Sequence, residues 1–139
     1  MNRECIDILI KKLALESDKQ ALAILAPAGL TPSQFKIIKL LLWEGDAQIR
    51  QVDIEKHFSM TNPTVTGLLK NLEDKGWIRR EVNPEDSRSK IICLTDEALA
   101  RREELCGYGE QIEESLIHDL NEKERETLEK LLTKLVKQG

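Results

Sequence analysis

Residues 60–78 read MTNPTVTGLLKNLEDKGWI, a pattern typical of one amphipathic helix between two boundary signals. Pro63 disfavours helical angles in the residue before it, so either Thr61 or Asn62 caps the helix. Gly76 suits the left-handed position that follows a helix. The spacing therefore predicts a helix over Asn62–Lys75 whose inward face consists of Val65, Leu68, Leu69 and Leu72.

The outer face of this predicted helix carries small and polar side chains, which let its backbone approach another surface closely. These residues are Asn62, Pro63, Thr64, Thr66, Gly67, Lys70 and Asn71. Threonine can donate to phosphates or base edges, asparagine can pair with adenine, and a helix N-terminus favours a phosphate. An ordinary solvent-facing helix is the alternative. A short predicted helix over Val52–Phe58 and a turn at Ser59–Thr61 favour a helix-turn-helix that enters the DNA major groove.

A charged hairpin is predicted next, with strands over Trp77–Val82 and Lys90–Leu94 and a tip over Asn83–Ser89. Asp86 can hold the Arg88 guanidinium in a fixed pose, which suits insertion into a narrow, electronegative minor groove. Lys90, with Arg79 or Arg80, can reach flanking phosphates. Taken alone, the tip fits better a polar surface turn with a salt bridge worth about 0–1 kcal/mol.

The rest of the chain is predicted to be helical. Apolar spacing predicts a helix over residues 4–26, and Thr31-Pro32-Ser33-Gln34 is a capping-box start for a helix that closes at Trp43. A very short strand at Ile49–Gln51 is an open alternative. Thr95 can cap a long helix, in which Ala98, Leu105 and Ile112 recur every seven residues, and a last helix begins near Asn121. The fold class is mainly α with a small β-wing.

Composition narrows the functional classes. The 139 residues carry a net charge of −4, of which −5 falls after residue 95 and +1 within 31–95. No stretch of 18 apolar residues and no signal-peptide pattern occurs, so we expect a cytoplasmic protein without a membrane span. The three cysteines have no metal-ligand spacing, and we find no P-loop, dinucleotide fingerprint or nucleophile elbow. We therefore expect no enzyme activity, no metal and no cofactor.

These motifs together resemble the MarR (multiple antibiotic resistance regulator) family of bacterial transcription factors. The resemblance covers Thr31–Thr95 and lies in the segments 30–35, 63–66, 72–78 and 86–88 and in Leu94-Thr95. It implies a homodimer that binds double-stranded DNA at a pseudo-palindromic operator, usually as a repressor. Arg88 matches the family's wing-tip arginine and Asp86 its orienting aspartate. Gly67 and Asn71 depart from the family, because many relatives have a basic residue at each position.

The resemblance also predicts the domain organisation. A single winged-helix domain over 1–139 would contain a DNA-binding lobe over 31–95 and dimerisation helices over 1–28 and 96–139. Packing of these helices against a second copy would cover their apolar stripes and set two probe helices roughly 34–36 Å apart. The alternative is that the stripes cover the core of their own chain.

Relatives often respond to small aromatic ligands, which would make this chain a repressor released by a ligand. Phe35 and Trp43 are the candidate pocket residues, although such residues more often belong to a plain core. An oxidant-sensing repressor acting through Cys5 is one alternative. A winged-helix module that binds another protein and never touches DNA is a second, and salt-dependent binding to a duplex would distinguish it.

Overall fold

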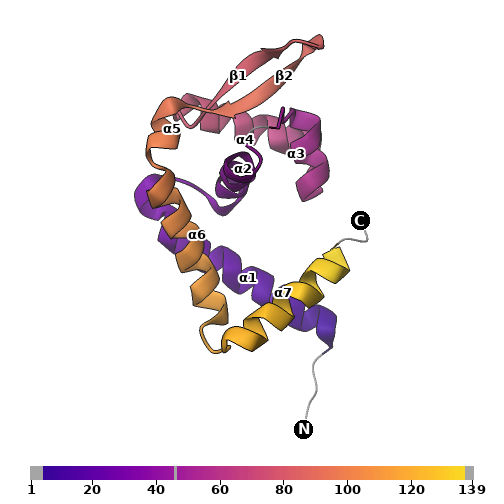
Figure 1. The fold of residues 1–139 in the computed structure, drawn as a ribbon, viewed down its shortest axis with the longest axis vertical. Helices are drawn as coiled ribbons and strands as arrows, with labels where there is room; N and C mark the ends of the chain where they lie inside the picture. The colour runs from indigo at the N-terminus through magenta and orange to yellow at the C-terminus, as the bar shows by residue number, and fades with distance from the viewer. Residues whose placement is uncertain (1–4, 46, 137–139) are drawn as a thin grey trace.

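The computed structural model describes residues 5–45 and 47–136. Its helices are α1 (Ile6–Leu25), the single 3-10 turn η1 (Ala26–Ala28), α2 (Pro32–Trp43), α3 (Gln51–Phe58), α4 (Asn62–Asp74), α5 (Asp96–Ala100), α6 (Arg102–Ile117) and α7 (Glu122–Val136). Strands β1 (Ile78–Asn83) and β2 (Asp86–Leu94) form an antiparallel sheet. Helices α2 to α4 and the sheet gather at one end of the molecule, and α1 and α6 run away from it (Figure 1). The predicted fold class is confirmed.

The start of α2 is the predicted capping box. The Thr31 hydroxyl accepts from the Gln34 backbone N–H at 3.2 Å, and the Gln34 side chain accepts from the Thr31 N–H at 3.1 Å. Both hydrogen bonds join residues within the segment 31–34, so the start of α2 could be predicted from these four residues alone. Lys75, just after α4, donates to the Gly29 carbonyl at 2.6 Å and fixes the end of α4 against the segment that leads into α2.

The hairpin differs from the sequence prediction in its extent. β1 begins at Ile78 rather than Trp77 and reaches Asn83, while β2 begins at Asp86 rather than Lys90. Only Pro84 and Glu85 separate the strands, so the predicted tip over Asn83–Ser89 was too long. The Asn83 side chain accepts from the Glu85 N–H at 3.0 Å, and this local bond closes the turn earlier than composition indicated.

The segment before α3 is joined to the wing. Arg50 forms a bridge with Ile91, and the Ile92 N–H donates to the Ile49 carbonyl at 2.7 Å. The short strand considered at Ile49–Gln51 is therefore one bridge, and α3 begins at Gln51. This bridge holds β2 beside the start of α3.

The predicted long helix after Thr95 is broken at Arg101 into α5 and α6. The Arg101 guanidinium lies 4.6 Å from the Trp77 ring centroid and pairs with Glu104 at 2.7 Å. Hydrogen bonds from Arg101 and Tyr108 lower the pKa of Glu104 to about 2. Ala98, Leu105 and Ile112 are nevertheless all buried, so the seven-residue spacing identified the core face correctly across the break.

One core joins the elements, centred on Leu25, Ile38, Ile54, Leu69 and Leu105. In contrast, α7 has no buried residue, and large apolar side chains remain exposed along both α1 and α7. No single helix in the described ranges is long and apolar enough to cross a membrane. The segment formed by α1 with η1 and by α2 meets the length and composition of a membrane span only as a pair, which is bent by 77°.

Candidate nucleic-acid interface

Helix α4 presents its predicted outer face to solvent. The Thr61 hydroxyl caps it by accepting from the Thr64 N–H at 3.4 Å. Val65, Leu69 and Leu72 are buried and Leu68 is half-buried, which anchors the inner side. All the predicted outer residues are exposed: Asn62, Pro63, Thr64, Thr66, Gly67, Lys70 and Asn71. The helix is therefore held from behind and open on the face that the sequence indicated.

The Asp86–Arg88 pairing predicted for the wing is present. The Asp86 carboxylate accepts from the Arg88 backbone N–H at 3.0 Å and lies 3.6 Å from its guanidinium. The Arg88 side chain is 93% exposed. Because Asp86 holds only one edge of the guanidinium, the remaining donors of Arg88 face solvent.

A groove of about 460 Å³ separates the wing from α3 and the start of α4. Its lining combines predicted residues from the helix and the wing with residues that the prediction omitted: Arg50, Gln51, Val52, Glu55, Asn62, Thr66, Arg80, Arg88, Ser89, Lys90 and Ile92. Four cationic side chains and one carboxylate line it, so the groove is basic although the whole chain is acidic. Thr64, Gly67, Lys70 and Asn71 are exposed on α4 outside this groove.

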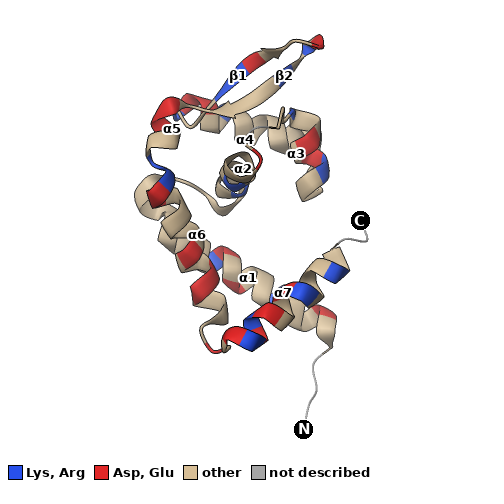
Figure 2. Cartoon of the chain, in the orientation of Figure 1, with Lys and Arg blue, Asp and Glu red and all other residues tan. Residues whose placement is uncertain are grey.

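The distribution of charge along the fold follows the sequence. Basic and acidic residues both mark the wing and α3, whereas Asp and Glu recur along α6 (Figure 2). Some groove cations are already paired, since Arg50 contacts Asp53 at 3.3 Å and Arg80 lies 3.6 Å from Glu73. The bond from the Arg50 backbone N–H is the main cause of the lowered pKa of Asp53. The cationic side chains that line the groove therefore contrast with the acidic side chains along α6.

A hydrogen-bond network joins α3 to α4 through Gln51, Glu55, Asn62 and Thr66. Gln51 and Glu55 are functional candidates that the sequence prediction missed. Their four-residue spacing places them on one face of α3, but only the crossing of the two helices brings Asn62 and Thr66 to them. The four-residue spacing of Gln51 and Glu55 could therefore be recognised in the sequence, whereas their hydrogen-bond partners on α4 could not.

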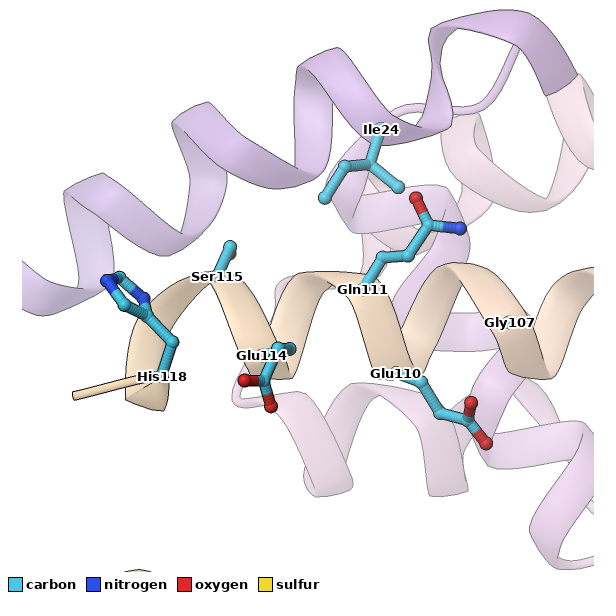
Figure 3. Close-up of a pocket in the computed structure, with 7 residues that line it drawn as sticks. All are labelled: Ile24, Gly107, Glu110, Gln111, Glu114, Ser115 and His118. Carbon is cyan, nitrogen blue, oxygen red and sulfur yellow. The ribbon is translucent and has the colours of Figure 1, made fainter. Parts of the chain in front are cut away.

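The two predicted pocket residues differ in their exposure. Phe35 is a core residue with 2% of its surface exposed, and Trp43 is 81% exposed at the end of α2. A crevice of about 770 Å³ lies between α1 and α6, lined by Ile24, Gly107, Glu110, Gln111, Glu114, Ser115 and His118 (Figure 3). Glu114 in this crevice pairs with Arg125 at 2.9 Å, which lowers the Glu114 pKa.

The cysteines offer no metal site within the described ranges, where no group of three or more metal-ligating side chains occurs. Cys5 is exposed and precedes α1. Cys93 is half-buried, and burial raises the pKa of its thiol. Cys106 is exposed.

Comparison with known proteins identifies consistent relatives. Residues 30–90 match the model of the MarR family. The chain is 32% identical over 120 residues to the HTH-type transcriptional regulator YwoH of Bacillus subtilis, covering 86% of this chain and 85% of that protein. It is 32% identical over 130 residues to the multiple antibiotic resistance protein MarR of Salmonella typhimurium, covering 92% and 88%.

Solved structures agree over nearly the whole chain. The Staphylococcus aureus MepR–DNA complex superimposes with a TM-score of 0.83 at 29% identity, covering 98% of each chain. A mutant form of Escherichia coli MarR complexed with operator DNA superimposes with a TM-score of 0.80 at 30% identity, covering 94% of this chain and 92% of that one.

Proposed function

The chain belongs to the MarR family of transcriptional regulators, which bind DNA and are not enzymes, and from this we propose that it is a homodimeric repressor released from a pseudo-palindromic operator by a small ligand. The observation that carries the proposal is the basic groove between α4 and the wing. It combines exposed hydrogen-bonding side chains on a helix with an oriented arginine on a hairpin.

In the proposed complex, α4 lies in the major groove and the wing follows the adjacent minor groove. Thr64, Thr66, Lys70 and Asn71 face the base edges and nearby phosphates from α4. Arg88 enters the minor groove, where a narrow groove concentrates negative potential, and Lys90 contacts the backbone. Gly67 has nothing within 4 Å of where a Cβ would stand, so its contribution is close approach rather than a contact of its own.

Exposed apolar helices support the dimer. On α7, Leu131, Leu132, Leu135 and Val136 are between 44% and 77% exposed, and α1 exposes seven further Ile and Leu side chains. Contiguous apolar patches on soluble proteins mark interaction surfaces. A second copy packed on these helices would cover them and would give each operator two probe helices, one for each half-site.

The crevice between α1 and α6 supports the proposal that a small ligand releases the repressor from its operator. A bound molecule there would contact α1, which carries part of the exposed apolar surface, and would change how two subunits pack. Repression would then end because the separation of the two probe helices no longer matches the operator.

The test of this function is selection of bound fragments from the source genome by the purified dimer, followed by affinity measurement on the recovered sequence at several salt concentrations. We expect one enriched motif with two-fold symmetry and an affinity that falls steeply with salt. Recovery of unrelated fragments, with affinity equal to that for shuffled DNA, would contradict sequence-specific binding. Binding of a symmetric site by a monomer would contradict the dimer.

Replacing Arg88 with Ala is expected to weaken operator binding about 10-fold or more, because each inserted arginine contributes about 1–3 kcal/mol. The side chain is 93% exposed, so the thermal midpoint should not change. Fluorescence anisotropy on the selected operator measures the effect, and Arg102→Ala, an exposed arginine on α6, is the matched control. Unchanged binding at physiological salt would remove the wing from the mechanism.

A further inference from the structure

Glu55 is a carboxylate within a groove that otherwise presents cations to DNA. Its Oε2 atom accepts from the Asn62 side-chain amide at 2.9 Å and from the Gln51 side-chain amide at 3.2 Å. A carboxylate near phosphates opposes binding to any duplex, whatever its sequence. The position of Glu55 therefore calls for a role that offsets this cost.

The orientation of both amides follows from the chemistry of their partners. A carboxylate oxygen can only accept, so the amide nitrogens of Gln51 and Asn62 must face Glu55. Gln51 Nε2 also donates to Thr66 Oγ1 at 2.9 Å and to the Asn62 main-chain carbonyl at 3.5 Å. Rotating the Gln51 amide by half a turn would set its oxygen against two groups that can only accept, the Glu55 carboxylate and the Asn62 carbonyl, and the same rotation of Asn62 would set an oxygen against the carboxylate.

These hydrogen bonds determine which donors and acceptors of Gln51 and Asn62 remain available to a DNA base. Both hydrogens of the Gln51 amide are engaged within the protein, which leaves its carbonyl oxygen as an acceptor. Thr66 donates to Asn62 Oδ1 at 3.5 Å, so Asn62 also uses both ends of its amide internally. A bidentate amide–adenine contact requires the nitrogen and the oxygen of one amide together, and Gln51 cannot provide both while its two hydrogens are engaged, whereas Asn62 keeps one amide hydrogen free.

We propose that Glu55 is a specificity-determining positioning residue, which holds Gln51 and Asn62 so that, with Thr66, they meet DNA as one fixed set of hydrogen-bonding groups. This inference rests on the proposed function, since it assigns a role within the same DNA-binding groove. Glu55 acts through its neighbours and contacts no base itself. Its negative charge lowers affinity for all duplexes, and the fixed amides restore affinity only where the base edges match.

The experiment compares wild-type protein with the Glu55→Ala and Glu55→Gln variants on the selected operator and on a shuffled duplex of equal length. The ratio of the two dissociation constants is measured at several salt concentrations. For Glu55→Ala we expect this ratio to fall about 10-fold or more, since a well-placed base contact contributes about 1–3 kcal/mol of discrimination. Binding to the shuffled duplex should strengthen, because one negative charge is removed.

Glu85→Gln is the matched control, because Glu85 is an exposed carboxylate at the wing tip that the network does not include. Its loss should alter affinity for both duplexes alike and leave their ratio unchanged. Glu55→Gln keeps the size of the side chain and one acceptor oxygen, so it reports on positioning even if Glu55→Ala is unstable. We expect a smaller fall in the ratio for this variant.

A double-mutant cycle separates positioning from a general effect on stability. If Glu55 acts through Gln51, the Glu55→Ala and Gln51→Ala variants should enrich the same altered motif, and the double variant should lose little more than either single one. A wild-type protein without preference for any duplex would overturn both this inference and the proposed function. A wild-type preference that Glu55→Ala and Glu55→Gln both retain at full ratio would overturn the role of Glu55 alone.

Discussion

A Thr66→Glu variant is expected to lose specific operator binding, with at least roughly a 100-fold rise in the dissociation constant. Thr66 is exposed on α4, and its hydroxyl is bonded to Gln51. A glutamate there would bring a second carboxylate beside Glu55 and would face DNA phosphates, and the dimer would carry it twice. Charge repulsion and the lost network act in the same direction, so the effect should exceed that of any single lost contact. Electrophoretic mobility shift with the selected operator measures it.

Two control variants test whether the loss of binding is specific to a carboxylate at position 66. Thr66→Ser keeps the hydroxyl and should retain most of the affinity. Thr133→Glu adds the same charge at an exposed site on α7, on the face opposite Leu131, and should leave operator binding unchanged. Since Thr66 is exposed, circular dichroism should give the wild-type thermal midpoint for all three variants. Specific binding by Thr66→Glu would show that a different face of α4 meets the DNA.

A Leu131→Glu variant is expected to be a monomer at concentrations where the wild type is a dimer. Leu131 is 55% exposed on a helix with no buried residue, so its own chain leaves this apolar surface uncovered and the proposed dimer would cover it. The symmetry of a homodimer would bury two unpaired carboxylates, at about 3–5 kcal/mol each. Monomers would also lose the gain from binding two linked half-sites, a factor of about 10²–10⁴ in affinity.

Analytical ultracentrifugation measures the oligomeric state, and operator affinity is measured on the same samples. Thr133→Glu is the matched control, because it introduces the same carboxylate two residues further along α7, on the opposite face. We expect this control to stay dimeric and to bind the operator. If Leu131→Glu also remained dimeric, the surface of α7 would not contribute to the interface.

Boundary signals that depend on neighbouring residues were predictable from the sequence. The Thr31 capping box is confirmed, Thr61 rather than Asn62 caps α4, and α4 ends one residue earlier than predicted. The seven-residue spacing of Ala98, Leu105 and Ile112 identified buried positions, because a helical stripe is a local property. The same spacing gave no sign of the break at Arg101, since the stripe continues through it.

Features that depend on how the elements cross were not predictable. The role of Gln51 and Glu55 emerges only when α3 and α4 place four polar side chains together. The early start of β2 follows from the tight turn closed by Asn83, and composition alone favoured a longer loop. The different surroundings of the two candidate pocket residues also depend on the packing, since Phe35 lies in the core and Trp43 faces solvent.

The Ile92 N–H donates to the Ile49 carbonyl, and Arg50 forms a bridge with Ile91. These two contacts hold the wing at a fixed position relative to α3 and α4. The interval between the contacts of Thr66 and those of Arg88 is then a fixed length along a half-operator. Inserting one base pair within a half-site, which adds about 3.4 Å and a rotation, would misalign one of the two contacts. In the proposed dimer the two lobes would be joined through α1, α6 and α7, so changes in spacing between the half-sites should be tolerated better than insertions within one half-site.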